Sequence, residues 1–335
     1  MNIIFLTHSS DQGHRFRVEQ YFPLLRDHGI EPLWQPLLSS VKDRISIYQK
    51  LPQFDIVCIQ RRLLSPIEFL WVRKRSKKIL FDLDDAIMYR SSRSPRPHSF
   101  SRRFKFRWMV KKSDAVIAGN RFLWEEVRKV APTKEVFILP TPLDLNAYPE
   151  KKEVHFSDDV MIGWMGTKGN LRYLETLEPV FKALAPHFPH VKLKVVSNGH
   201  FESRYLPTIN KGWVLEEENQ DLISFDIGLM PLEDNLWSRG KCGLKIIQYL
   251  SVGLPVVCSP VGMNQEIIQP GVNGFWAKRE EEWVEGLGGL IQNPELRREM
   301  GLRGIETVKE GYSLEVNFHK LLKILQRVEQ GALVP

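Results

Sequence analysis

Apolar and polar positions along the chain follow two alternating spacings. Short runs rich in Val, Ile, Leu and Phe predict buried strands, and the segments between them place apolar residues three or four positions apart, as amphipathic helices do. In the first half of the chain the predicted strands are 2–7, 31–36, 55–59, 79–83, 115–118 and 136–139. Strands that alternate with helices in this way are typical of parallel α/β layers.

The connection between the first strand and the first helix is short of glycine. The loop at 7–14 has one glycine and no GxGxxG sequence, so a dinucleotide fingerprint is absent. The apolar spacing that follows predicts a helix from Phe16 to His28, with Gly29 as its C-cap.

A second α/β series occupies the rest of the chain. Its helices are predicted at Tyr173–His187 and Lys241–Leu250, and a last helix at about 313–330. Its strands are predicted at 160–166, 192–197, 213–216, 226–231, 255–259 and 274–277. Two Rossmann-like halves are the simplest architecture with this order.

The chain length agrees with two domains, because 335 residues is about twice the usual size of one. A charged stretch at 149–158 follows several prolines and is interpreted as a linker. We therefore expect an acceptor-side domain at 1–148, a second domain at 149–312 and a C-terminal helix and tail at 313–335. The last helix is expected to pack back on the first domain.

Composition excludes several classes of protein. With 43% hydrophobic and 26% charged residues, the chain is neither disordered nor collagen-like. It has no apolar run of about 20 residues and does not start with a signal-peptide pattern, so we expect a cytoplasmic protein. Three cysteines without a CxxC pair argue against a disulfide framework and a structural zinc site.

Positive charge is concentrated in residues 61–112. This segment holds sixteen Lys or Arg against four acidic residues, although the whole chain carries only +7. Such an excess predicts an anionic partner such as a phospholipid surface, a lipid diphosphate or nucleic acid, and the alternative is a solvated face. Basic and apolar residues interleave at 100–109, as they do in interfacial helices.

An Asp-x-Asp sequence ends the strand predicted at 79–83. Asp82 and Asp84 resemble the first motif of haloacid-dehalogenase phosphatases, but Ala86 stands where that family has Thr or Val. One of the aspartates could instead cap a turn. The remaining alternative places Asp84 or Asp85 at an interdomain cleft, where a carboxylate can accept a proton from an acceptor hydroxyl.

The stretch 239–257 combines glycines and lysines at a predicted helix start. Gly240 and Gly243 would let the backbone approach a ligand, and the amides at a helix N-terminus favour a phosphate. Lys241, Lys245 and Gln248 are spaced to share one helix face. The pattern indicates a diphosphate site, with a solvated helix face as the alternative.

A family resemblance rests on these residues and on those that follow. Asp226-Ile-Gly-Leu-Met-Pro231, the Gly/Lys helix, Gly253-Leu-Pro-Val-Val257, Gly262, Glu266 and Gly271-Val-Asn-Gly274 resemble, in order and spacing, the nucleotide-sugar-binding domain of GT-B glycosyltransferases. The chain is most similar to glycosyltransferase family 4 (group 1). The resemblance implies two Rossmann-like domains that face each other across a cleft.

The resemblance also implies roles for individual residues. Lys241 and Lys245 would stabilise the leaving diphosphate, and no metal or other cofactor would be required. The family's two glutamates fall at Gly240 and Gln248, of which the glutamine can still bond ribose hydroxyls. The implied donor-binding residues are Gly166, Thr167, Lys168, Asn198, Trp213, Val214, Arg239, Gly240, Gly243 and Gln248.

The expected activity is transfer of a hexose from a UDP- or GDP-linked sugar to an acceptor glycan or lipid-linked glycan. It would serve cell-surface polysaccharide or glycolipid synthesis at the inner face of the membrane, with retention favoured over inversion. A related nucleotide-sugar epimerase or phosphorylase, and a phosphatase built on Asp82 and Asp84, are the alternatives. Nucleic acid is not an expected partner, because the chain lacks a recognised nucleic-acid-binding module.

Overall fold

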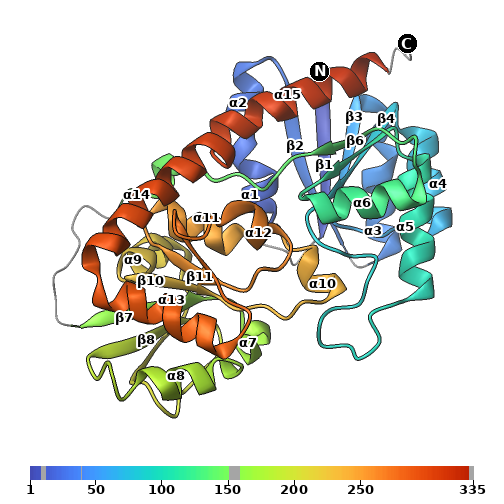
Figure 1. The fold of residues 1–335 in the computed structure, drawn as a ribbon. Helices are drawn as coiled ribbons and strands as arrows, with labels where there is room; N and C mark the ends of the chain where they lie inside the picture. Colours follow the sequence, from blue (N-terminus) through green and yellow to red (C-terminus); the bar gives the residue numbers. More distant parts are fainter. Residues whose placement is uncertain (9–12, 39, 151–158, 332–335) are drawn as a thin grey trace. The chain divides into compact units, whose positions relative to one another are not determined.

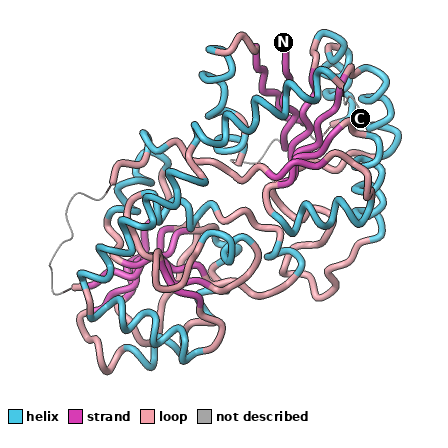
Figure 2. The backbone as a smooth tube through the Cα atoms, turned by 45° about the horizontal axis from the view of Figure 1, so that its top comes forward, coloured by secondary structure: helices cyan, strands magenta, loops and turns pink. Residues whose placement is uncertain are grey.

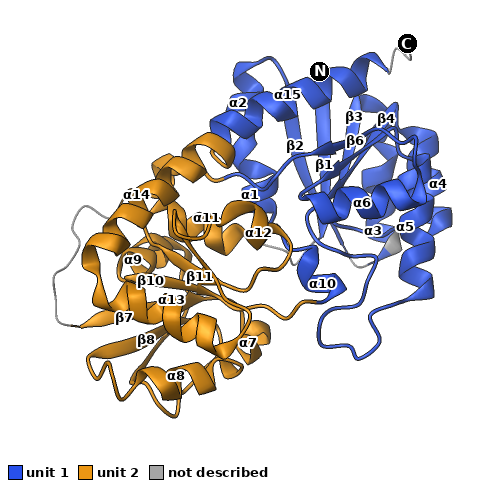
Figure 3. Ribbon diagram, viewed as in Figure 1, with its two compact units in different colours: residues 1–142, 235–242, 314–335 blue, residues 143–234, 243–313 orange. Residues whose placement is uncertain are grey.

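The chain folds into two compact units. The computed structural model describes residues 1–8, 13–38, 40–150 and 159–331. Unit 1 comprises 1–142, 235–242 and 314–335, and unit 2 comprises 143–234 and 243–313 (Figure 3). Most of the stretch interpreted as a linker, 151–158, lies outside the described residues.

Unit 1 is built on a six-stranded parallel sheet of order β2-β1-β3-β4-β5-β6 (Figure 1). Its strands are β1 (Asn2–His8), β2 (Glu31–Leu37), β3 (Ile56–Gln60), β4 (Lys78–Leu83), β5 (Ala115–Ala118) and β6 (Val136–Ile138). All six predicted strands are confirmed, and runs of buried apolar residues mark β1, β3, β4 and β5 clearly in the sequence. Ile3, Leu6, Ile56 and Phe81 have no exposed surface.

Helices surround this sheet (Figure 2). They are α1 (His14–Arg17), α2 (Phe22–Asp27), α3 (Val41–Gln49), α4 (Pro66–Arg75), α5 (Phe100–Lys112), α6 (Arg121–Val130), α10 (Leu236–Arg239) and α15 (Leu314–Gln330). The single helix predicted from Phe16 to His28 is wrong: Val18 has φ −130° and ψ −66°, which ends α1, and Pro23 stands at the start of α2. Gly29 has φ +68°, as the C-cap prediction required.

The last helix, α15, belongs to unit 1. Its apolar face buries Phe318, Leu321 and Leu325 against residues of β1, β3 and β4. The expectation that the C-terminal helix packs on the first domain is therefore confirmed.

Unit 2 contains a second six-stranded parallel sheet, of order β12-β11-β10-β7-β8-β9. Its strands are β7 (Val160–Met165), β8 (Val191–Val196), β9 (Thr208–Lys211), β10 (Ile227–Met230), β11 (Val256–Cys258) and β12 (Gly274–Trp276). The strand predicted at 213–216 is wrong, because β9 pairs with β8 through 208–211. Val214 and Leu215 are instead exposed and lead into a helical turn.

The helices of unit 2 are α7 (Arg172–Glu175), α8 (Glu178–Leu184), α9 (Glu218–Ile223), α11 (Leu244–Ser251), α12 (Met263–Ile267), α13 (Glu280–Gln292) and α14 (Pro294–Gly311). The helix predicted at Tyr173–His187 is divided, and Pro179 stands in the first turn of its second part. The helix predicted from Lys241 begins at Leu244, because Gly243 has φ +69° and interrupts the backbone before it.

The residues at 235–242 correct the expected domain boundaries. They fall in the middle of the predicted second domain but belong to unit 1. Asn120 explains this placement, since its side-chain amide donates to the carbonyl oxygens of Arg239 (3.2 Å) and Lys241 (3.0 Å). The compact units also divide at 142/143, six residues before the predicted boundary.

In each sheet the chain adds strands first on one side of the first strand and then on its other side. In unit 1 the chain passes from β1 to β2 and then to β3 on the other side of β1; in unit 2 it passes from β7 through β8 and β9 and then to β10 on the other side of β7. Ligands of open parallel sheets bind beyond the carboxyl ends of strands at such reversals. The loops after β1, β3 and β7 are therefore the places to look for a site.

We expect Phe318→Ala to lower the free energy of unfolding by about 3–5 kcal/mol, because the ring is almost fully buried between α15 and the sheet. Urea denaturation followed by circular dichroism measures this change. Lys323→Ala, on the exposed face of the same helix, should leave stability unchanged. Equal midpoints for the two variants would contradict the packing of α15.

Candidate functional site

Three neighbouring loops of unit 2 hold most of the predicted donor-binding residues. Gly166, Thr167 and Lys168 follow β7, Asn198 follows β8, and residues 213–214 follow β9. The three strands are adjacent and parallel, so these loops meet at one edge of the sheet. The backbone amide of Lys168 donates to Oδ1 of Asn198 at 2.7 Å, which joins the first two loops.

A buried carboxylate, Glu218, connects the third loop to α11. Its oxygens accept hydrogen bonds from the Tyr148 hydroxyl (2.6 Å), the Trp213 indole N–H (2.9 Å) and Nε2 of Gln248 (3.0 Å). Lys245 Nζ donates to Oε1 of Gln248 at 2.9 Å. The structure thus brings Trp213, Lys245 and Gln248 together. Figure 3 shows α9, which begins at Glu218, and α11 in the same unit.

Gln248 is fully buried, and its side-chain amide donates to both Glu218 and Tyr148. It therefore holds the internal network in place. Sequence reasoning missed Glu218 and Tyr148, because both are distant from Gln248 in the chain. The only signal was a glutamine on the apolar helix α11, which needs hydrogen-bond partners when buried.

Lys241, Lys245 and Gln248 do not share one helix face as expected, because Lys241 lies outside α11. Lys245 lies in the first turn of α11 and contacts Gln248 three residues later. Lys241 precedes Gly243 and lies in unit 1. Gly243 is needed at this break for two reasons: its φ is positive, and a Cβ there would lie 2.5 Å from Ile267.

In unit 1, Asp82 lies near the end of β4 and is one half of a buried ion pair. Both of its carboxylate oxygens accept from Arg17, the shortest contact being 2.7 Å, and Arg17 also donates to the Leu139 carbonyl. Asp82 thus satisfies a buried guanidinium. This role gives no support to a phosphatase in which Asp82 is the nucleophile.

Asp84 and Asp85 lie beyond the same strand and share Arg61. Arg61 NH1 is 2.8 Å from Oδ2 of Asp85 and 3.4 Å from Oδ2 of Asp84. Burial raises the pKa of Asp84 to about 7, with the negative charges of Asp85 and Asp82 adding to the effect and Arg61 opposing it. One oxygen of Asp84 is buried without a hydrogen bond. Asp84 can therefore exchange a proton near neutral pH.

The 235–242 segment packs against the loop that carries these aspartates. A Cβ on Gly240 would lie 2.4 Å from Cβ of Ala86 and 2.7 Å from its backbone nitrogen. The thiol of Cys242 donates to the carbonyl oxygen of Asp84 at 3.1 Å. Position 240, where the resembling family has a glutamate, therefore has no room for a side chain.

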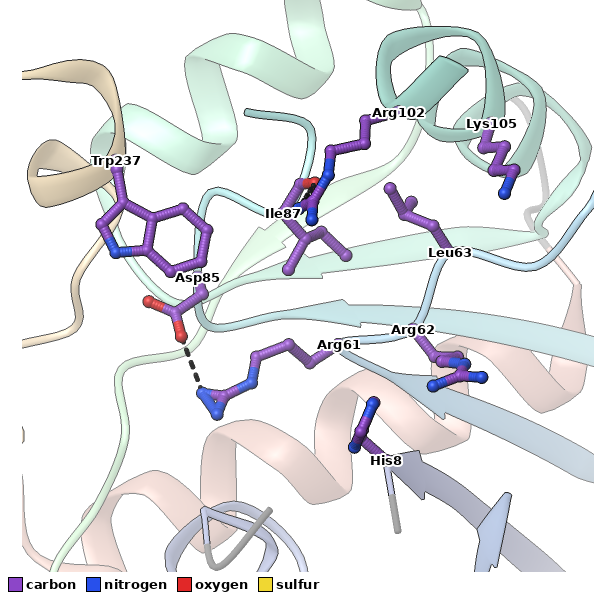
Figure 4. A pocket seen from close by; sticks show the side chains of 9 residues that line it. All are labelled: His8, Arg61, Arg62, Leu63, Asp85, Ile87, Arg102, Lys105 and Trp237. Carbon is purple, nitrogen blue, oxygen red and sulfur yellow. Dashed lines mark hydrogen bonds and ion pairs between the residues drawn. The ribbon is translucent and has the colours of Figure 1, made fainter. Parts of the chain in front are cut away.

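A cavity of about 550 Å³ opens at this edge of the unit 1 sheet (Figure 4). Asp85 is the one lining residue that the sequence analysis had singled out as a catalytic candidate. The cavity is lined by His8, Arg61, Arg62, Leu63, Asp85, Ile87, Arg102, Lys105 and Trp237. The sequence showed the basic segment but not which of its members face inward.

Within 1–8, 13–38, 40–150 and 159–331, no cluster of three His, Cys, Asp or Glu side chains could hold a metal ion. Over the same residues, no helix has the length and apolar character needed to cross a bilayer. Cys58, Cys242 and Cys258 are buried free thiols.

Comparison with known proteins gives a family match in the second half of the chain. Residues 160–293 match the family model for Glycosyl transferases group 1. An uncharacterized glycosyltransferase of Haemophilus influenzae is 26% identical over 211 residues, which cover 59% of this chain and 56% of that protein. N-acetyl-alpha-D-glucosaminyl L-malate synthase of Bacillus anthracis is 25% identical over 236 residues, covering 62% of this chain and 58% of that protein. The chain thus spans little more than half of each relative.

Solved structures show the same fold over nearly the whole chain. Sucrose-phosphate synthase of Thermosynechococcus elongatus aligns with a TM-score of 0.77 at 14% identity, covering 99% of this chain and 100% of that one. Anabaena HepE in complex with UDP and glucose aligns with a TM-score of 0.73 at 13% identity, covering 97% and 99%. These likenesses and the family match confirm the resemblance to GT-B glycosyltransferases, and family 4 within them stays a prediction. Residues 160–293 thus match the group 1 glycosyltransferase family, within a chain that has the GT-B fold.

Proposed function

We propose that this protein is a glycosyltransferase that moves a sugar from a nucleotide diphosphate to an acceptor hydroxyl. The observation that carries this proposal is the group 1 match at 160–293, because that range contains the loops after β7, β8 and β9 and the start of α11. An epimerase or phosphorylase on the same fold would give different products from the same donor. Product analysis therefore separates the three activities.

The proposed donor is UDP-linked. Structures of Anabaena HepE contain UDP, and others contain UDP-glucose or UDP with glucose, which supports a uridine nucleotide over a guanosine one. In unit 2, Asn198, Trp213 and Val214 would contact the nucleoside, and Gly166, Thr167 and Lys168 the phosphates. Lys168 is exposed beside its loop, and among the described residues no hydrogen bond or ion pair engages its ammonium group.

The chemical step would place new negative charge on the diphosphate. The bond between the anomeric carbon and the donor oxygen breaks, and its electron pair remains on the leaving diphosphate. The acceptor oxygen bonds to that carbon, and its proton passes to an oxygen of the leaving diphosphate. Lys245 and the N-terminal amides of α11 can stabilise the leaving group without a metal. Lys241 and Arg239 remain predictions for the same role.

Retention of anomeric configuration is the proposed outcome, as the family resemblance implies. Inversion would require a base for the acceptor hydroxyl, and Asp84 or Asp85 would then supply it. Nuclear magnetic resonance of the product distinguishes the two outcomes.

The acceptor is proposed to be membrane-associated, which would place the enzyme in the cytoplasm at the inner face of the membrane. Along α5, Phe100 is 88% exposed and Phe104 is 47% exposed, and their rings stack with centroids 6.3 Å apart. Arg103, Arg107 and Lys111 lie on the same helix. Exposed aromatic rings among cations suit an anionic lipid surface. A lipid-linked glycan for cell-surface polysaccharide or glycolipid synthesis fits that location.

Lys245→Ala should lower kcat by about 10²–10³-fold in a transfer assay with UDP-glucose, because the leaving diphosphate loses a cation. The variant should still fold but lose about 1–3 kcal/mol of stability, because Oε1 of buried Gln248 loses its donor. Lys182→Ala, an exposed position on α8, is the matched control and should keep full activity. Unchanged turnover in folded Lys245→Ala removes Lys245 from the site, and no product from UDP- or GDP-sugars with the wild type contradicts the proposed function.

Gln248→Glu should destabilise the protein by about 1–3 kcal/mol, because it places a second buried carboxylate where Nε2 now lies 3.0 Å from Glu218. The exchanged pair Glu218→Gln with Gln248→Glu should recover most of this loss and most of the UDP affinity. Urea denaturation and calorimetric titration with UDP measure both. A double variant no more stable than the single one would show that the two side chains are not coupled.

Wild-type protein should sediment with vesicles that contain phosphatidylglycerol and much less with phosphatidylcholine alone. Each Lys or Arg near an anionic leaflet contributes about 1 kcal/mol of binding free energy, and salt screens this attraction. About 1 M salt should therefore release most of the bound protein. Replacing Phe100 and Phe104 by Ser should weaken binding at low salt, whereas Leu33→Ser, an exposed apolar control on β2, should not. Full recovery in every supernatant would mean that the face of α5 is only solvated.

A further inference from the structure

The cavity in unit 1 lies at the carboxyl ends of β1 and β3, where the strand order of the sheet changes from one side of β1 to the other. His8 ends β1, and Arg61 and Arg62 follow β3 directly, so both sides of the reversal contribute to the lining. Asp85 comes from the loop after β4. An open parallel sheet binds its ligands in this position. A volume of about 550 Å³ is enough for a small molecule or the head group of a larger one.

The charges that line the cavity are not balanced. Asp85 is the one carboxylate among the lining residues, and it is paired with Arg61 at 2.8 Å. Arg102 donates to the carbonyl oxygens of Ile87 (3.3 Å) and Tyr89 (3.0 Å), which orient it without neutralising its charge. An excess of positive charge in a concave surface concentrates anions.

Two of the cations have no partner in the described part of the chain. The side chains of Arg62 and Lys105 form no hydrogen bond or ion pair there, although both residues are half-buried and line the cavity. Cations removed from water are costly unless they are paired. A guanidinium and an ammonium group offer several N–H donors to the oxygens of one anion.

The backbone at this turn is also unusual. Arg61 has φ +49°, and it is the one non-glycine residue with positive φ in the described part of the chain. Its amide donates to the Asp82 carbonyl oxygen at 2.9 Å, which holds the turn. Strain of this kind persists where the surroundings fix it, and it is concentrated at ligand sites.

We propose that this cavity binds an anionic group of the acceptor, a phosphoryl or carboxylate group, through Arg62 and Lys105. Figure 4 shows these two side chains on one side of the cavity, and Asp85 and Trp237 on the other. A hydroxyl group at the other end of the acceptor then lies on the side of Asp85. This inference rests on the proposed glycosyl transfer and adds the substrate class, a hydroxyl compound with a separate negative charge.

Calorimetric titration with inorganic phosphate and with succinate tests the site, with saturating UDP present to occupy the proposed donor site. Wild-type protein should bind at least one of the two anions, and the stronger of them assigns the site to a phosphoryl or to a carboxylate group. The double variant Arg62→Ala with Lys105→Ala should bind that anion about tenfold or more weakly. Lys105→Arg should keep most of the affinity, and Lys74→Ala, an exposed residue of α4 outside the cavity, should keep all of it.

UDP affinity separates failure of this inference from failure of the proposed function. Two results overturn the inference while the donor site stands, both with normal UDP binding by every variant. In the first the anions bind equally to the wild type and all variants, and in the second they bind to none of these proteins. If the wild type does not bind UDP or GDP, the proposed function fails as well. Lys105→Ala alone serves if the double variant does not fold.

Discussion

Parallel pairing of the strands is the constraint on which the rest of this structure depends. Because every strand in each sheet runs in the same direction, all the connecting loops at the carboxyl ends lie along one edge. Residues that are distant in sequence meet at this edge. Lys168 is bonded to Asn198, and His8 and Arg61 line the same cavity. The residues that we propose for donor and acceptor binding lie at these two edges.

Buried polar groups at those edges are satisfied in different ways. Arg17 and Asp82 neutralise each other within the core of unit 1, so they fix the end of β4 and present no free charge. Glu218 is equally buried and accepts hydrogen bonds from three neutral donors, on Tyr148, Trp213 and Gln248. Asp84 keeps an oxygen without a hydrogen bond. Asp84 therefore has capacity for a proton, whereas both oxygens of Asp82 already accept from Arg17.

The sequence predicted the sheets well and the site only in part. Most strands could be predicted because a run of apolar residues is visible in the local sequence alone. The helix expected from Lys241 begins later because Gly243 has a positive φ, and the close approach of Ile267 to this position is a long-range effect that the local sequence does not show. Glu218, Tyr148 and the cavity cations Arg62 and Lys105 were missed because only folding brings them to their partners or to one cavity. The motif at 239–257 was found, but its division between two units was not predictable from spacing.

The placement of α15 has a consequence for how the chain is made. Ribosomal synthesis proceeds from the N-terminus, so β1, β3 and the residues around Leu25 emerge long before Phe318 and Leu325. Until then the apolar face that α15 covers has no partner from its own chain. Unit 1 begins to be synthesised first and is completed last. A nascent chain arrested before residue 314 would expose the apolar residues that α15 covers, and chaperones bind such residues.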